Sequence, residues 1–573
     1  MSCGFPESSI VSQRRLIISF IGLTLCGIAA SLLFYYGFAG RYSLAEFGYL
    51  HRQSIGTLNH FSNEGALLYI ATFILLFACY WFGYRILRHI GQRWFLLLIV
   101  GFSVVFNLIM VQMYPADASD IYDYIIRGRM TSVYGLNPFQ NVPNDIKQDP
   151  FYDFTSWHSV PSAYGPAWEW LAGIASRLAG DDRTTNVIAF KLLSIAGYYV
   201  ASVFVGLALF TAAPRRLLSG LYLWMWNPLL LFMTAGIGHH DALVAAAIAV
   251  ALYMVLRRWY MAATLALVLG MLLKFVPVVL VPIVAIIALR QLRGWLRLRY
   301  LALSAVLSIL LAVVAYAPYW HGWETVRLER RDRMYTGSVA TVVRQLLLPT
   351  LDHKPLETNP ADTPVTNALM ANVTIVLFGL YYLWQLSIAL RDDQEDTLLP
   401  IRIIGRVLLF YLLVVSLWFY GWYLIWILPV AAVLDDSPLR RLILRFSYLV
   451  TWQSFFYNYM VVMTKASAWL PWLDVTPVTI YMGYTWGYIA VYQVKSWLRQ
   501  WHIDPRNIAV GAKLQQARNA ANISRDRLSD ELGIRYDELE QYEHGERALT
   551  LDHARQLAQR FGLSLTDWLT QKA

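Results

Sequence analysis

The chain carries little charge. Asp, Glu, Lys and Arg together make up 15% of its 573 residues, whereas hydrophobic residues make up 57% and the mean hydropathy is +0.44. An ordinary soluble domain has about 25% charged residues, so the composition excludes that class. Apolar runs of about 20 residues, the length that a helix needs to cross a bilayer, recur along the chain. We therefore predict an all-α polytopic membrane protein.

Cysteine is also scarce. The chain has three cysteines, Cys3, Cys26 and Cys79, and their positions form neither a pair nor a metal-ligand spacing. Cys26 and Cys79 lie in apolar runs, where a free cysteine is most simply a small buried residue. We expect no cofactor.

Lys and Arg gather in short clusters between the apolar runs, and such clusters stay in the cytoplasm. The clusters lie at residues 14–15, 85–93, 215–216, 257–258 and 290–299. The formal charge of +10 is therefore no argument for nucleic acid. Because the chain must cross twice between successive clusters, we predict a multi-pass protein of the cytoplasmic membrane. It should have about 12 to 14 crossings, with both termini in the cytoplasm.

This topology places two large loops outside, near residues 114–185 and 319–371. Only 31 residues separate Arg258 from Arg290, too few for two full spans, so we predict two short helices that meet near Lys274 to Pro277. The predicted domains are a transmembrane domain over residues 1–495, a juxtamembrane linker over 496–510 and a soluble helical domain over 511–573.

The last segment, residues 511–573, is called the tail. From Ser524 to Leu569 it resembles the helix-turn-helix domain of Cro-type phage repressors, which implies a small helical bundle and a bacterial source. The residues that carry this resemblance are Leu528, Leu532, Gly533, Leu539, Glu543, Gly545, Leu557, Ala558 and Leu569. The helix that should enter the major groove, "YDELEQYEHG", has four acidic residues and no Lys or Arg, although phosphates require cations. We favour a protein partner for the tail over DNA.

Three aspartates follow an apolar run in the first outer loop, at Asp117, Asp120 and Asp123. One interpretation is structural: Asp117 and Ser119 would cap a helix that begins near Ile121. Asp123 is interpreted as the partner of Arg127, four residues later on the same helix. The other interpretation gives a carboxylate at the membrane surface a chemical task, and for Asp120 we favour it.

Five short segments, in this order, carry a resemblance to one family. They are "SDIYDYIIRGRMTSVYGLNPF" from Ser119, "SAYGPAWEW" from Ser162, "GIGHHDAL" from Gly236, "LLKFVP" from Leu272 and "GWYLIWILP" from Gly421. Over roughly residues 16–495 the chain resembles polyprenol-phosphate-mannose-dependent mannosyltransferases of the GT-C superfamily. The resemblance implies a polyprenyl-phosphate sugar donor, an extracytoplasmic glycan or lipid acceptor, and a catalytic aspartate in the first large loop.

Glycosyl transfer needs a base, because an acceptor hydroxyl must lose its proton as it attacks the anomeric carbon. Asp120 is our choice for that base, since it occupies the acidic position of the family-like Ser-Asp-x-Tyr-x-Tyr pattern. Asp117 is the second choice.

Other candidates are assigned to substrate binding. His239, His240 and Asp241 form an ionisable triplet at a helix end, where isolated charges are costly unless they have a function. We expect hydrogen bonds to a sugar rather than a metal, because adjacent residues of a helix point about 100° apart. Lys274 stands alone between apolar runs, where a lipid phosphate would supply the anion that a buried cation needs, or where it would snorkel to the interface.

Four further candidates also have structural alternatives. Asn137 and Tyr164 lie in the turn-like stretches "YGLNP" and "YGP", which loop geometry alone could explain. Arg330 and Arg331 would hold phosphate, or would belong to a solvated basic face balanced by neighbouring acids.

The prediction is thus a membrane glycosyltransferase that moves a hexose, with mannose expected, from a polyprenyl-phosphate carrier. Two hypotheses of other classes remain beside it: a secondary transporter or lipid-linked sugar flippase, and a membrane-tethered helix-turn-helix regulator.

Overall fold

The computed structural model describes residues 13–50, 53–326, 335–354, 362–390, 396–456, 459, 470–501 and 504–565. Throughout these ranges the regular elements are helices, and the β-structure consists of two isolated bridges, Ser43 with Met113 and Thr336 with Trp418. The predicted all-α class is confirmed.

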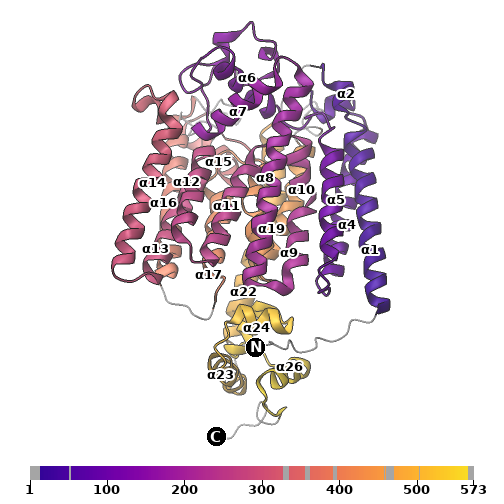
Figure 1. The fold of residues 1–573 in the computed structure, drawn as a ribbon, viewed down its shortest axis with the longest axis vertical. Coiled ribbons are helices and arrows are strands. Elements are labelled where there is room, and N and C mark those ends of the chain that lie inside the picture. Colours follow the sequence, from indigo (N-terminus) through magenta and orange to yellow (C-terminus); the bar gives the residue numbers. More distant parts are fainter. Residues whose placement is uncertain are drawn as a thin grey trace.

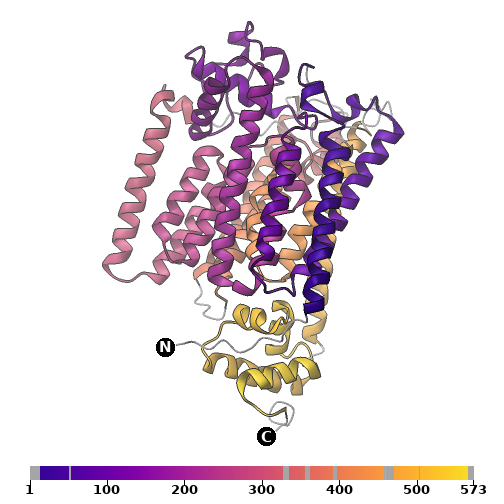
Figure 2. The same ribbon diagram turned by 45° about the vertical axis from the view of Figure 1, so that its right-hand side comes forward.

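Long helices run side by side along the long axis of the molecule (Figures 1 and 2). They are α1 (Gln13–Phe34), α4 (Asn63–Leu87), α5 (Phe95–Met110), α8 (Arg183–Ala212), α9 (Leu217–Met225), α11 (Asp241–Leu256), α12 (Tyr260–Leu273), α13 (Val281–Gln291), α14 (Trp295–Tyr316), α16 (Pro364–Leu390), α17 (Leu399–Phe410), α19 (Pro438–Leu449) and α22 (Leu470–Trp501). Further helices accompany them: α2 (Leu44–Phe47), α3 (Ile55–Leu58), α10 (Pro228–Leu231), α15 (Val339–Leu351), α18 (Leu428–Val433) and α20 (Thr451–Phe455).

The two ends of this bundle carry different structures. Helices α6 (Asp120–Ser132) and α7 (Pro166–Ala179) cover one end, which we call the loop face. The tail helices lie against the opposite end, which we call the tail face; they are α23 (Pro505–Ala520), α24 (Arg525–Leu532), α25 (Tyr536–Glu543) and α26 (Leu551–Phe561). The first outer loop and the tail are therefore separated by the whole length of the bundle.

Five helical segments in the described ranges are long and apolar enough to span a membrane, and a sixth is obtained if one bent pair counts as a span. They are Gln13–Ala39, Asn63–Leu87, Arg183–Ala212, Trp295–Tyr319 and Pro364–Leu390, with Pro214–Met225 and Pro228–Gly236 as the bent pair. Five shorter apolar helices accompany them. The chain is thus a membrane protein, while the count of 12 to 14 crossings stays a prediction.

The two short helices expected near Lys274 are confirmed. Helix α12 ends at Leu273, and the chain resumes in the 3₁₀ turn η6 (Val276–Leu280), which continues into α13. Pro277 explains the break, because proline has no N–H to donate and its ring clashes with the preceding helical turn. The break leaves Lys274 at the end of α12 with extended backbone.

The first outer loop is a folded unit in which α6 packs on α7, with the short turns η2 (Pro143–Ile146) and η3 (Tyr152–Phe154) between them. Arg127 Nε lies 2.9 Å from Asp123 Oδ2, and both side chains are buried. Thr155 donates to the other oxygen of Asp123 at 3.1 Å, and Arg127 donates to the Val160 carbonyl at 2.8 Å. The structural interpretation of Asp123 is confirmed.

The tail has its own apolar core, formed by Leu514, Ile523, Leu528, Ile534, Leu539, Tyr542, Leu557 and Ala558. Gly533 ends α24 in the left-handed conformation, and α25 follows after a short turn. The residues predicted as a linker, 496–510, belong mostly to the end of α22 and the start of α23. The predicted domain boundaries stay a prediction.

One prediction concerns the contact between α8 and α11. A Cβ added at Gly197 would lie 2.7 Å from the Leu243 amide nitrogen and 2.8 Å from the Ala242 carbonyl carbon, so α11 would have to shift. Such overpacking costs about 1–3 kcal/mol. We expect Gly197→Ala to lower the midpoint of thermal unfolding in detergent. Gly101→Ala is the control, since its Cβ would meet no described atom within 4 Å; equal midpoints for both variants would contradict the close approach.

Candidate functional site

Asp120 is the first residue of α6, at the loop face. Its Oδ2 lies 3.9 Å from Nδ1 of His239, and the Asp120 side chain keeps 23% exposure, whereas the His239 side chain keeps 1%. Asp117 is half-buried and accepts a 2.7 Å hydrogen bond from Ser454. Asp120 is therefore the aspartate that combines contact with the His-His-Asp triplet and access from outside.

The side chain of Ser119 does not cap α6, although the sequence allowed that role. Ser119 is the N-cap residue of α6, which begins at Asp120, but its side chain forms no capping hydrogen bond. The hydroxyl lies instead 3.1 Å from the Ser156 hydroxyl.

Gly238 sets the approach of the triplet to α6. The triplet follows the π-helical turn η5 (Phe232–Gly236), and Gly238 then has φ +88°. A Cβ added there would lie 2.6 Å from Ile121 Cδ1. A residue with a side chain would be strained at this φ, and the end of the Ile121 side chain would have to move, so glycine suits the close approach of the triplet to the first turn of α6.

His239 presents an unsatisfied polar edge at the site. Its ring stacks on Trp422 with centroids 4.0 Å apart and 18° between the planes. Both ring nitrogens are buried, and neither has a hydrogen-bond partner in the part of the chain that the structure describes. Burial and the charge of Lys274 lower the pKa of His239. A lowered pKa favours the neutral imidazole, which would make the contact with Asp120 a polar contact.

His240 points to different neighbours from those of His239. Its Nδ1 lies 3.0 Å from the Tyr124 hydroxyl, and its ring stacks on Trp168 at 4.5 Å. Tyr164 meets the same ring edge-on at 4.7 Å. The two imidazoles thus diverge, and within the described residues no three His, Cys, Asp or Glu side chains group so as to hold a metal ion.

Asp241 and Lys274 form a buried ion pair. Lys274 Nζ lies 2.7 Å from Asp241 Oδ1, and the indole N–H of Trp426 donates to the same oxygen at 2.6 Å. The ammonium also lies over the rings of Tyr423 and Trp426, at 4.6 and 4.9 Å. Lys274 is therefore held by an internal anion, which disfavours snorkelling; its contact with a lipid phosphate stays a prediction.

Trp422 and Trp426 lie in "GWYLIWILP", one of the five segments that carry the resemblance, but neither residue was assigned a role from the sequence. Both come from the 3₁₀ segment η12 (Gly421–Trp426), far along the chain from the triplet. Tryptophan in an apolar run is typical of a membrane interface, so the pattern alone contained no signal for contact with His239 or Asp241.

Two buried ionisable residues also went unnoticed. Lys191 of α8 donates to the carbonyls of Val111 and Met113, which fixes the chain that leads into the aspartates. Glu169 of α7 accepts a hydrogen bond from Ser162. Burial raises the pKa of Glu169 to about 7 despite the opposing charge of Arg127.

Asn137 forms hydrogen bonds that join two loops. Its side-chain N–H donates to the Tyr319 carbonyl at 2.7 Å and lies 3.2 Å from Nδ1 of His321, and its oxygen accepts from the Phe139 amide at 3.0 Å. These contacts favour the loop-geometry alternative, and substrate binding by Asn137 stays a prediction. Arg330 and Arg331 lie outside the described residues.

The sequence model of the family described as "Alpha-(1->6)-mannopyranosyltransferase, N-terminal domain" matches residues 24–290. These residues, a little under half of the chain, are similar to that domain. The match includes Asp120, the His239 to Asp241 triplet and Lys274, whereas Trp422 and Trp426 lie beyond it. A helix-turn-helix domain matches residues 511–573. Both resemblances predicted from the sequence are confirmed at this level.

Two curated relatives are also named as alpha-(1->6)-mannopyranosyltransferases. Alpha-(1->6)-mannopyranosyltransferase A of Corynebacterium glutamicum is 25% identical over 187 residues, which are 32% of this chain and 37% of the relative. A "Probable alpha-(1->6)-mannopyranosyltransferase" of Mycolicibacterium smegmatis is 29% identical over 142 residues, 23% of this chain and 24% of the relative. The chain thus spans less than two fifths of the length of each of these relatives.

The ion pair allows a test of site architecture that is independent of activity. Lys274→Met leaves the buried Asp241 carboxylate without the Lys274 ammonium, and breaking a buried pair in this way costs about 3–5 kcal/mol. Lys274→Met/Asp241→Asn removes both charges, so we expect it to regain at least half of the lost thermal stability, measured in detergent. A double variant whose loss equals the sum of the two single losses would contradict the pairing.

Proposed function

We propose that the chain is a membrane glycosyltransferase that transfers mannose from a polyprenyl-phosphate-linked donor to an extracytoplasmic glycan or lipid acceptor. The observation that carries this proposal is the placement of Asp120, a partly exposed carboxylate at a helix start, 3.9 Å from the buried His239. The family match over residues 24–290 and the names of the two relatives support mannose as the sugar.

The proposed reaction is a single inverting displacement. The acceptor oxygen forms a bond to the anomeric carbon as the bond from that carbon to the phosphate oxygen breaks, and the acceptor proton passes to Asp120. Polyprenyl phosphate leaves with the bonding electron pair. No metal or cofactor is needed in this scheme.

The remaining residues of the site would position the sugar. The free nitrogens of His239 and the unpartnered Oδ2 of Asp241 are buried polar atoms that lack a hydrogen bond among the described residues. Leaving such an atom unpaired costs about 1–3 kcal/mol. Sugar hydroxyls would satisfy both residues, and they would do so most fully in the geometry that brings the acceptor to Asp120. The Lys274 charge lies close enough to lower the pKa of His239 and would attract the donor phosphate.

The transporter and flippase hypothesis explains the apolar helices and the intramembrane ion pair. It does not explain a partly exposed carboxylate beside unpaired imidazole nitrogens at the loop face, and the family match favours transfer.

We further propose that the loop face is extracytoplasmic and that the tail lies in the cytoplasm, in the cytoplasmic membrane. In a background without Cys3, Cys26 and Cys79, we expect Gln148→Cys and His353→Cys to react with an impermeant thiol reagent in intact cells. Asn519→Cys should react only after the cells are opened. All three positions are exposed in the structure, so a lack of labelling reports sidedness. Labelling of Asn519→Cys in intact cells would reverse the orientation.

The role of Asp120 is tested by Asp120→Asn, which keeps the size of the side chain but cannot accept the acceptor proton. Loss of a general base costs about 10²- to 10⁴-fold, so the rate of mannose transfer at saturating donor should fall within that range. The measurement uses membranes with equal amounts of each variant and labelled polyprenyl-phosphate mannose.

Asp117→Asn is the matched control, because it makes the same chemical change three residues earlier on a side chain that Ser454 already binds. It should lose much less activity. If Asp120 were only a first-turn helix residue, asparagine would serve nearly as well. Retention of more than about a third of the transfer rate by Asp120→Asn would therefore rule out its role as the base.

A further inference from the structure

The tail lies against the tail face, at the end of the bundle away from α6 (Figures 1 and 2). Residues of α24 and α25 make the contacts. In a helix-turn-helix domain the N-terminal residues of the second helix contact base edges in the major groove. Here that helix is α25, and its first residues, Tyr536 and Asp537, are 7% and 2% exposed. The surface that would read DNA is therefore covered.

Two ion pairs cross between the tail and the membrane domain. Arg216 Nε lies 2.8 Å from Asp530 Oδ1, and Arg441 Nη2 lies 3.1 Å from Asp537 Oδ2. In both pairs the carboxylate keeps less than a tenth of its exposure, so both carboxylates are covered where the tail meets the membrane domain. Arg215 also donates to the Glu531 carbonyl.

A fourth arginine, Arg402, contacts the first residue of α25. The guanidinium of Arg402 lies 3.9 Å above the ring of Tyr536, and the Tyr536 hydroxyl donates to Asp396 at 3.3 Å. Arg402 is itself held by Asp396 and Asp435, at 2.7 and 2.8 Å. The tyrosine therefore sits on a buried ion-pair network.

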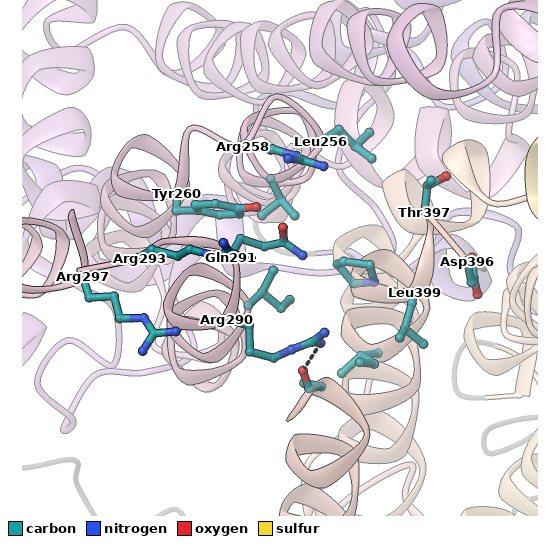
Figure 3. Close-up of a pocket in the computed structure, with 15 residues that line it drawn as sticks. Leu256, Arg258, Tyr260, Arg290, Gln291, Arg293, Arg297, Asp396, Thr397 and Leu399 are labelled. Carbon is teal, nitrogen blue, oxygen red and sulfur yellow. Dashed lines mark hydrogen bonds between the residues drawn. The ribbon is translucent and has the colours of Figure 1, made fainter. Parts of the chain in front are cut away.

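The contact continues along α24 to the rim of a cavity. Asp526 accepts hydrogen bonds from the amide and the hydroxyl of Thr397. Thr397 and Asp396 line a cavity of about 710 Å³ that also contains Arg258, Arg290, Arg293 and Arg297 (Figure 3). The tail thus contacts the membrane domain at η4 (Pro214–Arg216), at the start of α17 and along α19.

The acidic residues of α25 are paired with arginines that lie outside the helix. Although the helix contains no Lys or Arg, each of its four acids meets an arginine from elsewhere. Glu543 pairs with Arg518 and Arg525 inside the tail, Glu538 pairs with Arg547, and Glu540 lies 3.7 Å from Arg525. Asp537 pairs with Arg535 of the tail at 2.5 Å and, alone of the four, also meets the membrane domain, through Arg441. The interpretation of an unbalanced acidic helix is corrected, since the balancing charges lie outside it.

We propose that the DNA-reading face of the tail is an intramolecular docking surface whose partner is the basic tail face of the same chain. Its contacts come from Tyr536, Asp537, Asp526 and Asp530, and they receive Arg216, Arg402 and Arg441. Docking and insertion of α25 into a major groove require the same residues, so the two are mutually exclusive.

The docked elements lead toward the candidate site. Arg216 directly precedes α9, and the chain continues through α10 and η5 to His239. Arg402 lies on α17, which continues through the π-helical turn η11 (Tyr411–Val415) to Trp422 and Trp426 in η12. The tail therefore joins the tail-face ends of two segments whose far ends meet at the His-His-Asp triplet.

The test uses the full chain in lipid nanodiscs, with a protease site inserted between Trp501 and Pro505. After cleavage, the fraction of tail that remains with the membrane domain is measured by size-exclusion chromatography at low and high salt. We expect the wild-type tail to stay bound at about 0.1 M salt and to be released at about 1 M, where the screening length falls from about 10 to about 3 Å. This arm needs no substitution and so does not depend on the folding of a variant.

A charge swap between Asp530 and Arg216 tests which surface of the tail contacts the membrane domain. Asp530→Arg should weaken retention at least tenfold, and Arg216→Asp/Asp530→Arg should restore it. Asp552→Arg is the matched control, because it makes the same charge change on an 85% exposed residue of α26 whose partner is Arg555; its retention should equal that of the wild type.

Several outcomes would overturn the proposal. They are release of the wild-type tail at about 0.1 M salt, wild-type retention by Asp530→Arg, and failure of the swap to restore binding. Micromolar binding of random duplex DNA by the uncleaved wild-type chain, far tighter than the ~0.1 mM at the weak end of non-specific binding, would also overturn it, because α25 would then be available to DNA.

Discussion

The buried ion pair between Lys274 and Asp241 is the contact on which the geometry of the site depends. An ammonium in an apolar bundle is stable only beside an anion, and a carboxylate at a buried helix start needs a cation. The pair can form because α12 stops at Leu273, where Pro277 prevents its continuation, and because α11 begins at Asp241. Trp426 then joins the same carboxylate, which brings η12 and with it Trp422 to His239. One electrostatic requirement thus orders the consecutive helices α11 and α12 and the segment η12, which is distant from them in the sequence.

Much of the fold could be predicted because it depends on interactions between residues that are close in the sequence. Apolar runs report membrane helices because nothing in hydrocarbon satisfies a free peptide group. The break near Lys274 followed from the number of residues available, and the Asp123 to Arg127 pair followed from the helical repeat. Each of these inferences needs only residues that are neighbours along the chain.

The candidate site was predictable only in the parts that are local. The aspartates and the His-His-Asp triplet are compact polar groups in an apolar sequence, and the structure places Asp120 next to His239. The aromatic platform under His239 was not predictable, because Trp422 lies in another part of the chain and differs in no local way from a tryptophan at the membrane interface. The hydrogen bond from Ser454 to Asp117 could not be predicted for the same reason. Contacts across such separations depend on packing, which a single sequence does not encode as a pattern.

The same limit explains why the charge of the tail was misjudged. A helix with four carboxylates and no cation repels phosphate if it is solvated, but it attracts guanidinium groups wherever the fold supplies them. Arg518 and Arg525 neutralise Glu543 within the tail, and Arg441 reaches Asp537 from the membrane domain. Basic clusters orient a membrane protein because they remain on one side of the membrane. The same clusters can therefore bind an acidic domain on that side. In this chain a helix-turn-helix fold could keep its apolar core while its DNA-reading face acquired a protein partner, since fold and function depend on different residues.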